Sequence, residues 1–138
     1  MIAELNLDYS EARRAIDTVV AEVARRGKAA VVVAADSHGE LIALARMDGA
    51  ALSSITIASN KAWTAVRAGK PSFDVGAKAR HPELGFDVSF YGDARICGWG
   101  GGIPVRKDGK IVGSLAVSGL PQEEDMEVAG LGIAAIGA

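Results

Sequence analysis

The sequence predicts an α+β domain with about five mainly antiparallel strands and helices packed on the sheet. Its 138 residues suit one domain, 1–138, and are too few for two of ordinary size. Hydrophobic residues make up 49% of the chain and charged residues 23%, so a packed core is expected and disorder is excluded. The patterns follow in the order helix, two strands, helix, short helix, loop, three strands, helix, which is typical of this fold class.

Four segments have the pattern of a helix. Asp8 and Glu11 form a capping-box motif at the start of the first, and Gly27 has the position of a glycine that ends it. Apolar residues between them recur at helical spacing. Further helices are expected over 53–68, capped by Ser53 or Ser54, over 73–79 and from residue 121 onward.

The strands are expected from apolar runs rich in β-branched residues. The run over 29–35 is followed by a turn and by an antiparallel partner over 40–47. Residues 80–93 have neither a helix pattern nor a strand pattern, which predicts a long loop. Such a loop in a compact domain is usually functional. Three more strands are expected over 96–99, 103–105 and 111–117.

Charge and composition exclude several classes of partner. The net charge of −2 leaves no basic surplus to neutralise phosphates, which argues against nucleic acid or an anionic membrane as partner. Aromatic residues are only 5% of the chain, which disfavours a base-stacking platform. A single cysteine, Cys97, excludes an internal disulfide. No leader-like or membrane-spanning pattern is visible, so a cytoplasmic location is expected.

Five motifs in order along the chain carry a resemblance to a known family. They are Arg46–Gly49, Asn60–Trp63, Gly100–Val105, Ile111–Gly119 and Asp125. The chain resembles, over nearly its whole length, the GlcG/HbpS-like family, which includes haem-binding proteins and the C-terminal domain of PduO-type proteins. The resemblance implies a profilin-like fold and a homo-oligomer, often an octamer. It also implies haem binding or a place in a catabolic pathway.

Three consecutive glycines, Gly100, Gly101 and Gly102, are the strongest local signal for a ligand site. Because they have no Cβ atoms, such residues can turn successive N–H groups toward an anion. Pro104 follows two residues later and would stiffen the exit from this loop. The alternative is a glycine bulge that only bends the sheet.

Arg46 and Lys61 are cations among apolar or small residues. Either can hold a carboxylate, the arginine through paired hydrogen bonds and the lysine as a point charge. Structural pairing is the alternative, with Asp48 beside Arg46. The candidate ligand-binding residues are therefore Arg46, Asp48, Gly100, Gly101, Gly102, Pro104 and Ser118, with Lys61 as a further source of countercharge.

His81 and Glu83 lie in the long predicted loop. A His-x-Glu pair can ligate a divalent metal or act as acid and base, although a third metal ligand would have to come from elsewhere. Lys61 can also act as a base. The candidate catalytic residues are therefore His81, Glu83 and Lys61.

Haem requires an axial donor, and the candidates are His38, Met47, His81, Tyr91 and Cys97. Cys97 has a second interpretation, as a buried strand residue that behaves as a small hydrophobe. Neither a dinucleotide-binding motif nor a phosphate-binding P-loop accompanies the glycines, so no nucleotide cofactor is expected.

Three function hypotheses follow. The first is a binding protein that takes haem or a related anionic small molecule near a subunit interface. The second is a cofactor-light enzyme, an isomerase or tautomerase, hydratase or lyase, that acts on a small carboxylate in a catabolic pathway. It would use His81 and Glu83 with Arg46 and the loop over Gly100–Gly102. The third is a purely structural oligomer.

Overall fold

The computed structural model describes residues 1–137 of the chain. Along the chain the elements are α1 (Tyr9–Arg25), β1 (Val31–Asp36), β2 (Leu41–Arg46), α2 (Ser53–Ala68), α3 (Ser72–Ala79), the 3₁₀ helix η1 (Val88–Tyr91), β3 (Gly102–Lys107), β4 (Lys110–Ser118) and α4 (Gln122–Ala135). The predicted α+β class is confirmed.

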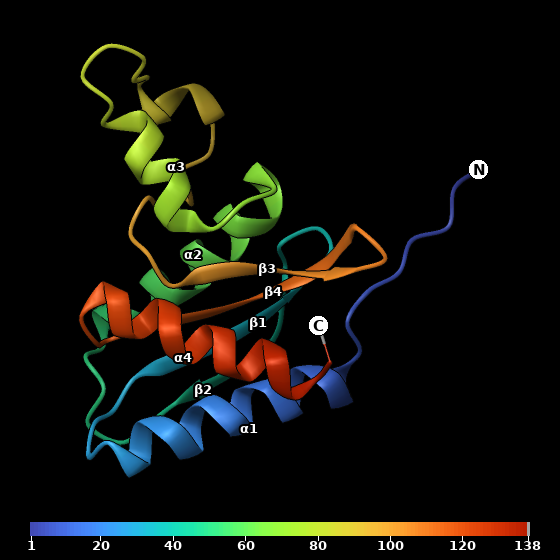
Figure 1. Cartoon of the computed structure of the whole chain (residues 1–138), viewed down its shortest axis with the longest axis vertical. Coiled ribbons are helices and arrows are strands. Elements are labelled where there is room, and N and C mark those ends of the chain that lie inside the picture. Colours follow the sequence, from blue (N-terminus) through green and yellow to red (C-terminus); the bar gives the residue numbers. More distant parts are fainter. Residues whose placement is uncertain (138) are drawn as a thin grey trace.

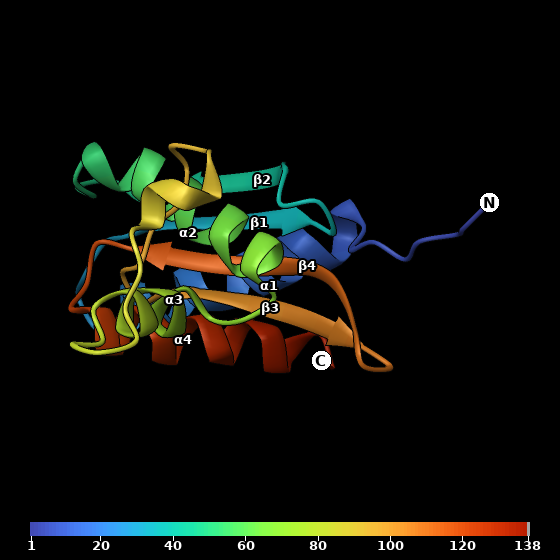
Figure 2. The same ribbon diagram turned by 90° about the horizontal axis from the view of Figure 1, so that it is seen from above.

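The sheet is antiparallel and has the strand order β2-β1-β4-β3. Helices α1 and α4 lie side by side across one face, and α2 covers the other (Figures 1 and 2). This layered arrangement leaves β2 and β3 as the two edges of the sheet. It also brings the end of β4 and the starts of α2 and α4 to one end of the molecule.

The central strand β1 is covered by helices on both faces, which explains why its sequence is a continuous apolar run. Val32 and Ala34 belong to the core beneath α1 and α4, whereas Val31, Val33 and Ala35 pack with α2 on the opposite face. All five side chains are buried because both faces of the strand are covered.

The predicted start of α1 is confirmed. The backbone N–H of Glu11 donates to Asp8 Oδ1 at 2.7 Å, and the backbone N–H of Asp8 donates to Glu11 Oε1 at 3.1 Å. The helix ends at Arg25, and Gly27 follows with φ of +71°, a conformation that glycine adopts without strain.

The sheet has four strands within the described residues, so the expectation of about five is wrong in its count. Residues 96–99, expected as a strand, form no ladder. The backbone N–H of Cys97 donates to Thr64 Oγ1 at 2.9 Å, and the carbonyl of Trp99 accepts from Ser72 Oγ at 2.7 Å. Side chains of α2 and α3 thus satisfy this backbone, and Cys97 is half-buried outside any strand.

The start of α2 also differs from the prediction. Leu52 holds the capping position and no side chain caps the helix, so neither Ser53 nor Ser54 has that role. Ser54 is instead buried and faces β4, where it meets Ser118.

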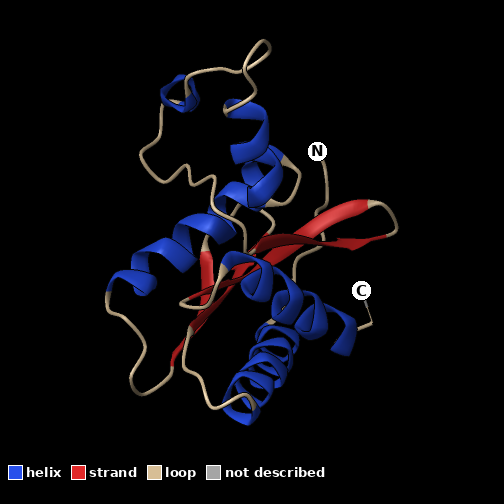
Figure 3. Ribbon diagram, turned by 60° about the vertical axis from the view of Figure 1, so that its left-hand side comes forward, coloured by secondary structure: helices blue, strands red, loops and turns tan. Residues whose placement is uncertain are grey.

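Helix α3 and the segment after it form an arm that projects from the rest of the domain (Figure 3). The segment predicted as a loop, 80–93, contains the short helix η1. Several apolar side chains of this arm are exposed, among them Leu84 and Phe90. Of the helices in residues 1–137, none is long and apolar enough to cross a membrane.

Candidate functional site

A groove lies at the end of the sheet where β4 finishes and α2 and α4 begin. It has a volume of about 430 Å³. We call it the Lys61 groove, and its lining residues are Ser54, Ile57, Lys61, Trp99, Ser118, Gly119, Leu120, Gln122 and Asp125. Four of these, Ser54, Lys61, Ser118 and Asp125, are polar side chains that are almost fully buried.

Lys61 and Asp125 form an ion pair at the wall of this groove. The ammonium nitrogen of Lys61 lies 3.2 Å from Asp125 Oδ2, and each side chain is only 3% exposed. Lys61 also donates to the carbonyl oxygen of Val117 at 2.9 Å, and the other carboxylate oxygen of Asp125 accepts from the Leu120 N–H at 3.1 Å. The pair therefore ties α2, β4 and α4 together.

Burial raises the pKa of Asp125 above its ordinary value, because removal from water disfavours the charged carboxylate. The charge of Lys61 and the hydrogen bond from Leu120 act in the opposite direction. The carboxyl group consequently holds a proton more readily than an exposed aspartate does.

The three glycines let β3 approach α2 and α4 closely. A Cβ atom on Gly102 would overlap the carbonyl oxygen of Lys61, and one on Gly101 would lie 2.9 Å from the Lys61 ammonium nitrogen. The N–H of Gly100 donates to Gln122 Oε1 at 3.0 Å, and that of Gly102 donates to Ser72 Oγ at 2.9 Å. Two of the three N–H groups thus already have partners in the protein, and the anion-binding role of this loop stays a prediction.

Trp99 separates the Lys61 groove from a second cavity. This indole is 59% exposed and lines both. The second cavity, of about 340 Å³, is called the Cys97 cavity here, and its lining residues are Gly76, Ala79, Arg80, Val88, Cys97, Gly98 and Trp99. Trp63, the other tryptophan, is buried, and the guanidinium carbons of Arg67 and Arg95 lie 5.2 Å and 4.7 Å from the centroid of its ring.

Arg46 lies on the same face and at the same end of the sheet as Ser118. Both residues pair with Val31, from strands on either side of it, and directly paired residues in an antiparallel sheet share a face. Arg46 and Asp48 are exposed and form no ion pair with each other in residues 1–137. Pro104 is half-buried in β3, opposite Ser114.

His81 and Glu83 are exposed in the arm and line neither the Lys61 groove nor the Cys97 cavity. The Nδ1 atom of His81 accepts from the backbone N–H groups of Glu83 at 3.2 Å and Leu84 at 3.0 Å. These two hydrogen bonds close the turn that follows His81. The enzyme hypothesis that uses these residues stays a prediction.

The candidate haem donors are distributed over the whole domain. Met47 packs against the core beneath α1 and α4, and His38 Nε2 lies 2.9 Å from Glu4 Oε2. Tyr91 is partly exposed beside Phe86 in the arm. Cys97 lines the cavity next to Trp99, whereas the other four candidate donors line neither this cavity nor the Lys61 groove. Over the part of the chain described, no group of three potential metal-ligating side chains gathers.

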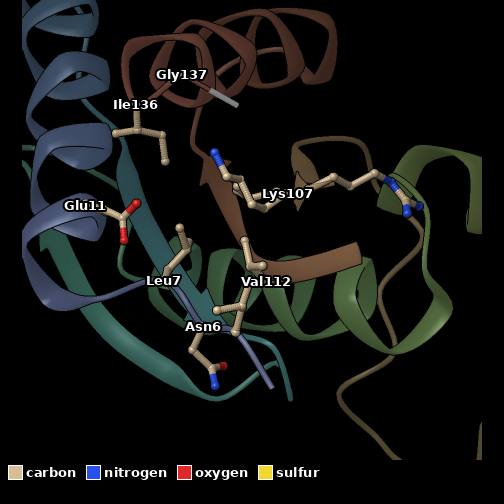
Figure 4. Close-up of a pocket in the computed structure, with 10 residues that line it drawn as sticks. Asn6, Leu7, Glu11, Lys107, Val112, Ile136 and Gly137 are labelled. Atoms are coloured by element: carbon tan, nitrogen blue, oxygen red, sulfur yellow. The ribbon is translucent and has the colours of Figure 1, made fainter. Parts of the chain in front are cut away.

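A third cavity, of about 220 Å³, lies between the N-terminal segment, β3 and the end of α4 (Figure 4). Its apolar lining comes from Leu5, Leu7, Val105, Val112 and Ile136. Its acidic group, Glu11, already caps α1, and none of the predicted site residues lines it. We therefore place the candidate site at the Lys61 groove and the Cys97 cavity.

The sequence did not indicate that Lys61 and Asp125 are partners, since they are separated by 64 positions. A lysine in an alanine-rich helix and an aspartate in an acidic first turn each have an ordinary explanation. The serine pair was missed as well, because Ser54 looked like a helix cap. One feature could have suggested a link, namely that both charged residues belong to motifs of the family resemblance.

The chain is thus an α+β domain with an open groove walled by buried polar side chains. The model of the family described as haem degrading protein HbpS-like matches residues 7–134, and the chain belongs to this HbpS-like family. The predicted family resemblance is thereby confirmed.

Solved structures and a curated relative agree with this family. A PduOC–haem complex is 27% identical with a TM-score of 0.87 and covers 95% of each chain. A double mutant of HbpS from Streptomyces reticuli is 26% identical with a TM-score of 0.88, covering 100% of this chain and 92% of that one. The corrinoid adenosyltransferase PduO of Salmonella typhimurium is 32% identical over 106 residues, 77% of this chain. The chain spans 32% of the length of that relative.

Proposed function

We propose that this chain binds haem, or a closely related flat anionic molecule, over Trp99. The observation that carries the proposal is the position of this exposed indole between two cavities. Aromatic faces favour flat apolar partners, and a large ligand on Trp99 would enter both cavities. The haem complex of PduOC, a protein of the same fold at 27% identity, supports the choice of ligand.

The charges around Trp99 suit an anionic ligand. Lys61 lines the groove on one side and Arg80 lines the Cys97 cavity on the other. Cys97 is the proposed axial donor, because a thiolate is a known haem ligand and this sulfur borders the site. Arg46, on the same sheet face, is proposed to contribute further positive charge.

We also propose that the chain forms a homo-oligomer and that the site lies near an interface between subunits. The edge strand β2 carries the exposed side chains of Leu41 and Leu44. A sheet edge with exposed apolar side chains is a surface that a second chain can cover.

The test is a hemin titration of the purified protein, followed by its Soret absorbance. We expect a saturable transition at one haem per chain. Cys97→Ala is expected to change the position of the Soret band and to weaken binding by at least about tenfold, because the axial donor is lost. His81→Ala is the matched control and should leave both the spectrum and the affinity unchanged.

Two results would contradict this account. An unsaturable rise in absorbance would show adventitious association of haem with the exposed apolar side chains. A Soret shift in His81→Ala but none in Cys97→Ala would move the axial donor to the arm.

A further inference from the structure

The Lys61 groove contains hydrogen-bond donors that the protein itself does not use. A lysine ammonium has three N–H donors, and Lys61 directs two of them to Val117 and Asp125. Within residues 1–137 the third has no acceptor, although the side chain is 97% buried at the wall of the groove. A buried donor without a hydrogen bond costs free energy, so an acceptor that enters the groove and accepts from Lys61 is bound favourably.

The two serines of the groove provide a second free donor. Ser118 Oγ donates to Ser54 Oγ at 3.3 Å, and Ser54 and Ser118 are 3% and 5% exposed. One hydroxyl hydrogen is used in this contact. The O–H of Ser54 has no acceptor among the described residues and lies in the same groove as the Lys61 ammonium.

The backbone adds positive potential at the same place. Helices α2 and α4 both begin at the groove, and neither has a side-chain cap. The uncapped start of a helix carries partial positive charge. Asp125, the acidic side chain that lines the groove, is balanced by Lys61, and Glu124 pairs with Arg26 and Lys28. Glu123, in the same first turn of α4, has no ion-pair partner among the described residues and does not line the groove.

We propose that the Lys61 groove is a carboxylate site, in which the third N–H of Lys61 and the O–H of Ser54 donate to the oxygens of one carboxylate. If the ligand is haem, whose propionate groups are carboxylates, this inference rests on the proposed function. A small free carboxylate has the same chemistry. Both donors are fixed by buried contacts, which favours a planar acceptor with two oxygens.

The experiment compares two porphyrins that differ only in their carboxylates. Hemin and its dimethyl ester are titrated into the native protein, Ser54→Ala and Ser59→Ala. Ser59 is the matched control, since it lies on the same helix and its hydroxyl donates to the carbonyl of Ile55 at 2.8 Å, away from the groove. Succinate is titrated by calorimetry into the same three proteins.

If the carboxylate comes from haem, the native protein binds hemin at least about tenfold more tightly than the ester, as expected for a hydrogen bond to a charged group. Ser54→Ala removes most of this preference and leaves the affinity for the ester unchanged. If a free carboxylate is the ligand, succinate binds to the native protein and to Ser59→Ala and at least about tenfold more weakly to Ser54→Ala.

Three results would overturn the carboxylate site. One is equal affinity for hemin and its ester together with no binding of succinate, which would leave haem binding itself intact. Another is an equal loss of hemin and ester binding in Ser54→Ala. The last is a preference for hemin that Ser54→Ala retains in full. Loss of that preference in a fourth protein, Arg80→Gln, would then place the carboxylate in the Cys97 cavity.

Discussion

Lys61→Met is expected to lower the free energy of unfolding by about 3–5 kcal/mol, since it leaves the buried carboxylate of Asp125 without its partner charge. The two side chains are 3.2 Å apart and almost fully buried, so water cannot replace the lost ammonium. The carbonyl of Val117 also loses a donor. Chemical denaturation of both proteins measures the difference.

The loss of stability in Lys61→Met should increase as the pH rises. Burial already raises the pKa of Asp125, and removal of Lys61 takes away an influence that lowers it, so the pKa rises further. A raised pKa in the folded state favours folding at pH values where the group is protonated, and this contribution is lost as the pH rises through the folded pKa. The deficit of Lys61→Met is therefore largest at neutral pH and shrinks as the pH falls.

Two variants serve as controls for this pair. Lys61→Met combined with Asp125→Leu removes both charges and should recover most of the lost stability, since an apolar replacement of a buried ion pair is often nearly neutral. Arg13→Met breaks the exposed 3.6 Å pair with Asp17 and should change stability by less than about 1 kcal/mol. A full deficit in the double variant would show that the charge of Asp125 is not its cause.

Gly102→Ala should destabilise the protein by about 3 kcal/mol, at the upper end of what overpacking usually costs. A Cβ at this position would overlap the carbonyl oxygen of Lys61 and lie 2.7 Å from its carbonyl carbon. Both obstacles are helix backbone, which cannot turn aside as a flexible side chain does. β3 would have to move away from α2, and the Lys61 groove would change shape with it.

Gly130→Ala is the matched control for this substitution. Gly130 lies in α4 with nothing within 4 Å of the added Cβ, so alanine should stabilise the helix by about 0.5–1 kcal/mol. Thermal unfolding of the two variants would show opposite shifts. A neutral Gly102→Ala would mean that β3 does not pack against α2 as closely as described.

Much of the fold could be predicted from local patterns. The capping box at Asp8 and the buried run of β1 each depend on neighbours in the sequence, and both lie where they were expected. The segment over 96–99 was mistaken for a strand because its apolar residues suit one. Its backbone is held by Thr64 and Ser72, from helices distant in the sequence, and no local pattern shows such contacts.

The candidate site was less predictable, because it is assembled from distant parts of the chain. Lys61, Ser118 and the glycines were named from the sequence, and the structure brings them to one end of the sheet. Ser54 was expected to cap a helix, and Asp125 was named only as part of the family resemblance, since only the packing of α2 and α4 on β4 places them in a groove. His81 and Glu83 formed an attractive pair in the sequence, yet they lie in the exposed arm.

The most direct test of the central claim is a crystal structure of this protein with hemin bound. We expect the porphyrin to cover Trp99, with its iron toward Cys97 and a carboxylate toward Ser54 and Lys61. Haem bound against Leu7 and Val112, in the cavity of Figure 4, would contradict it, as would haem held only by the exposed apolar side chains of the arm.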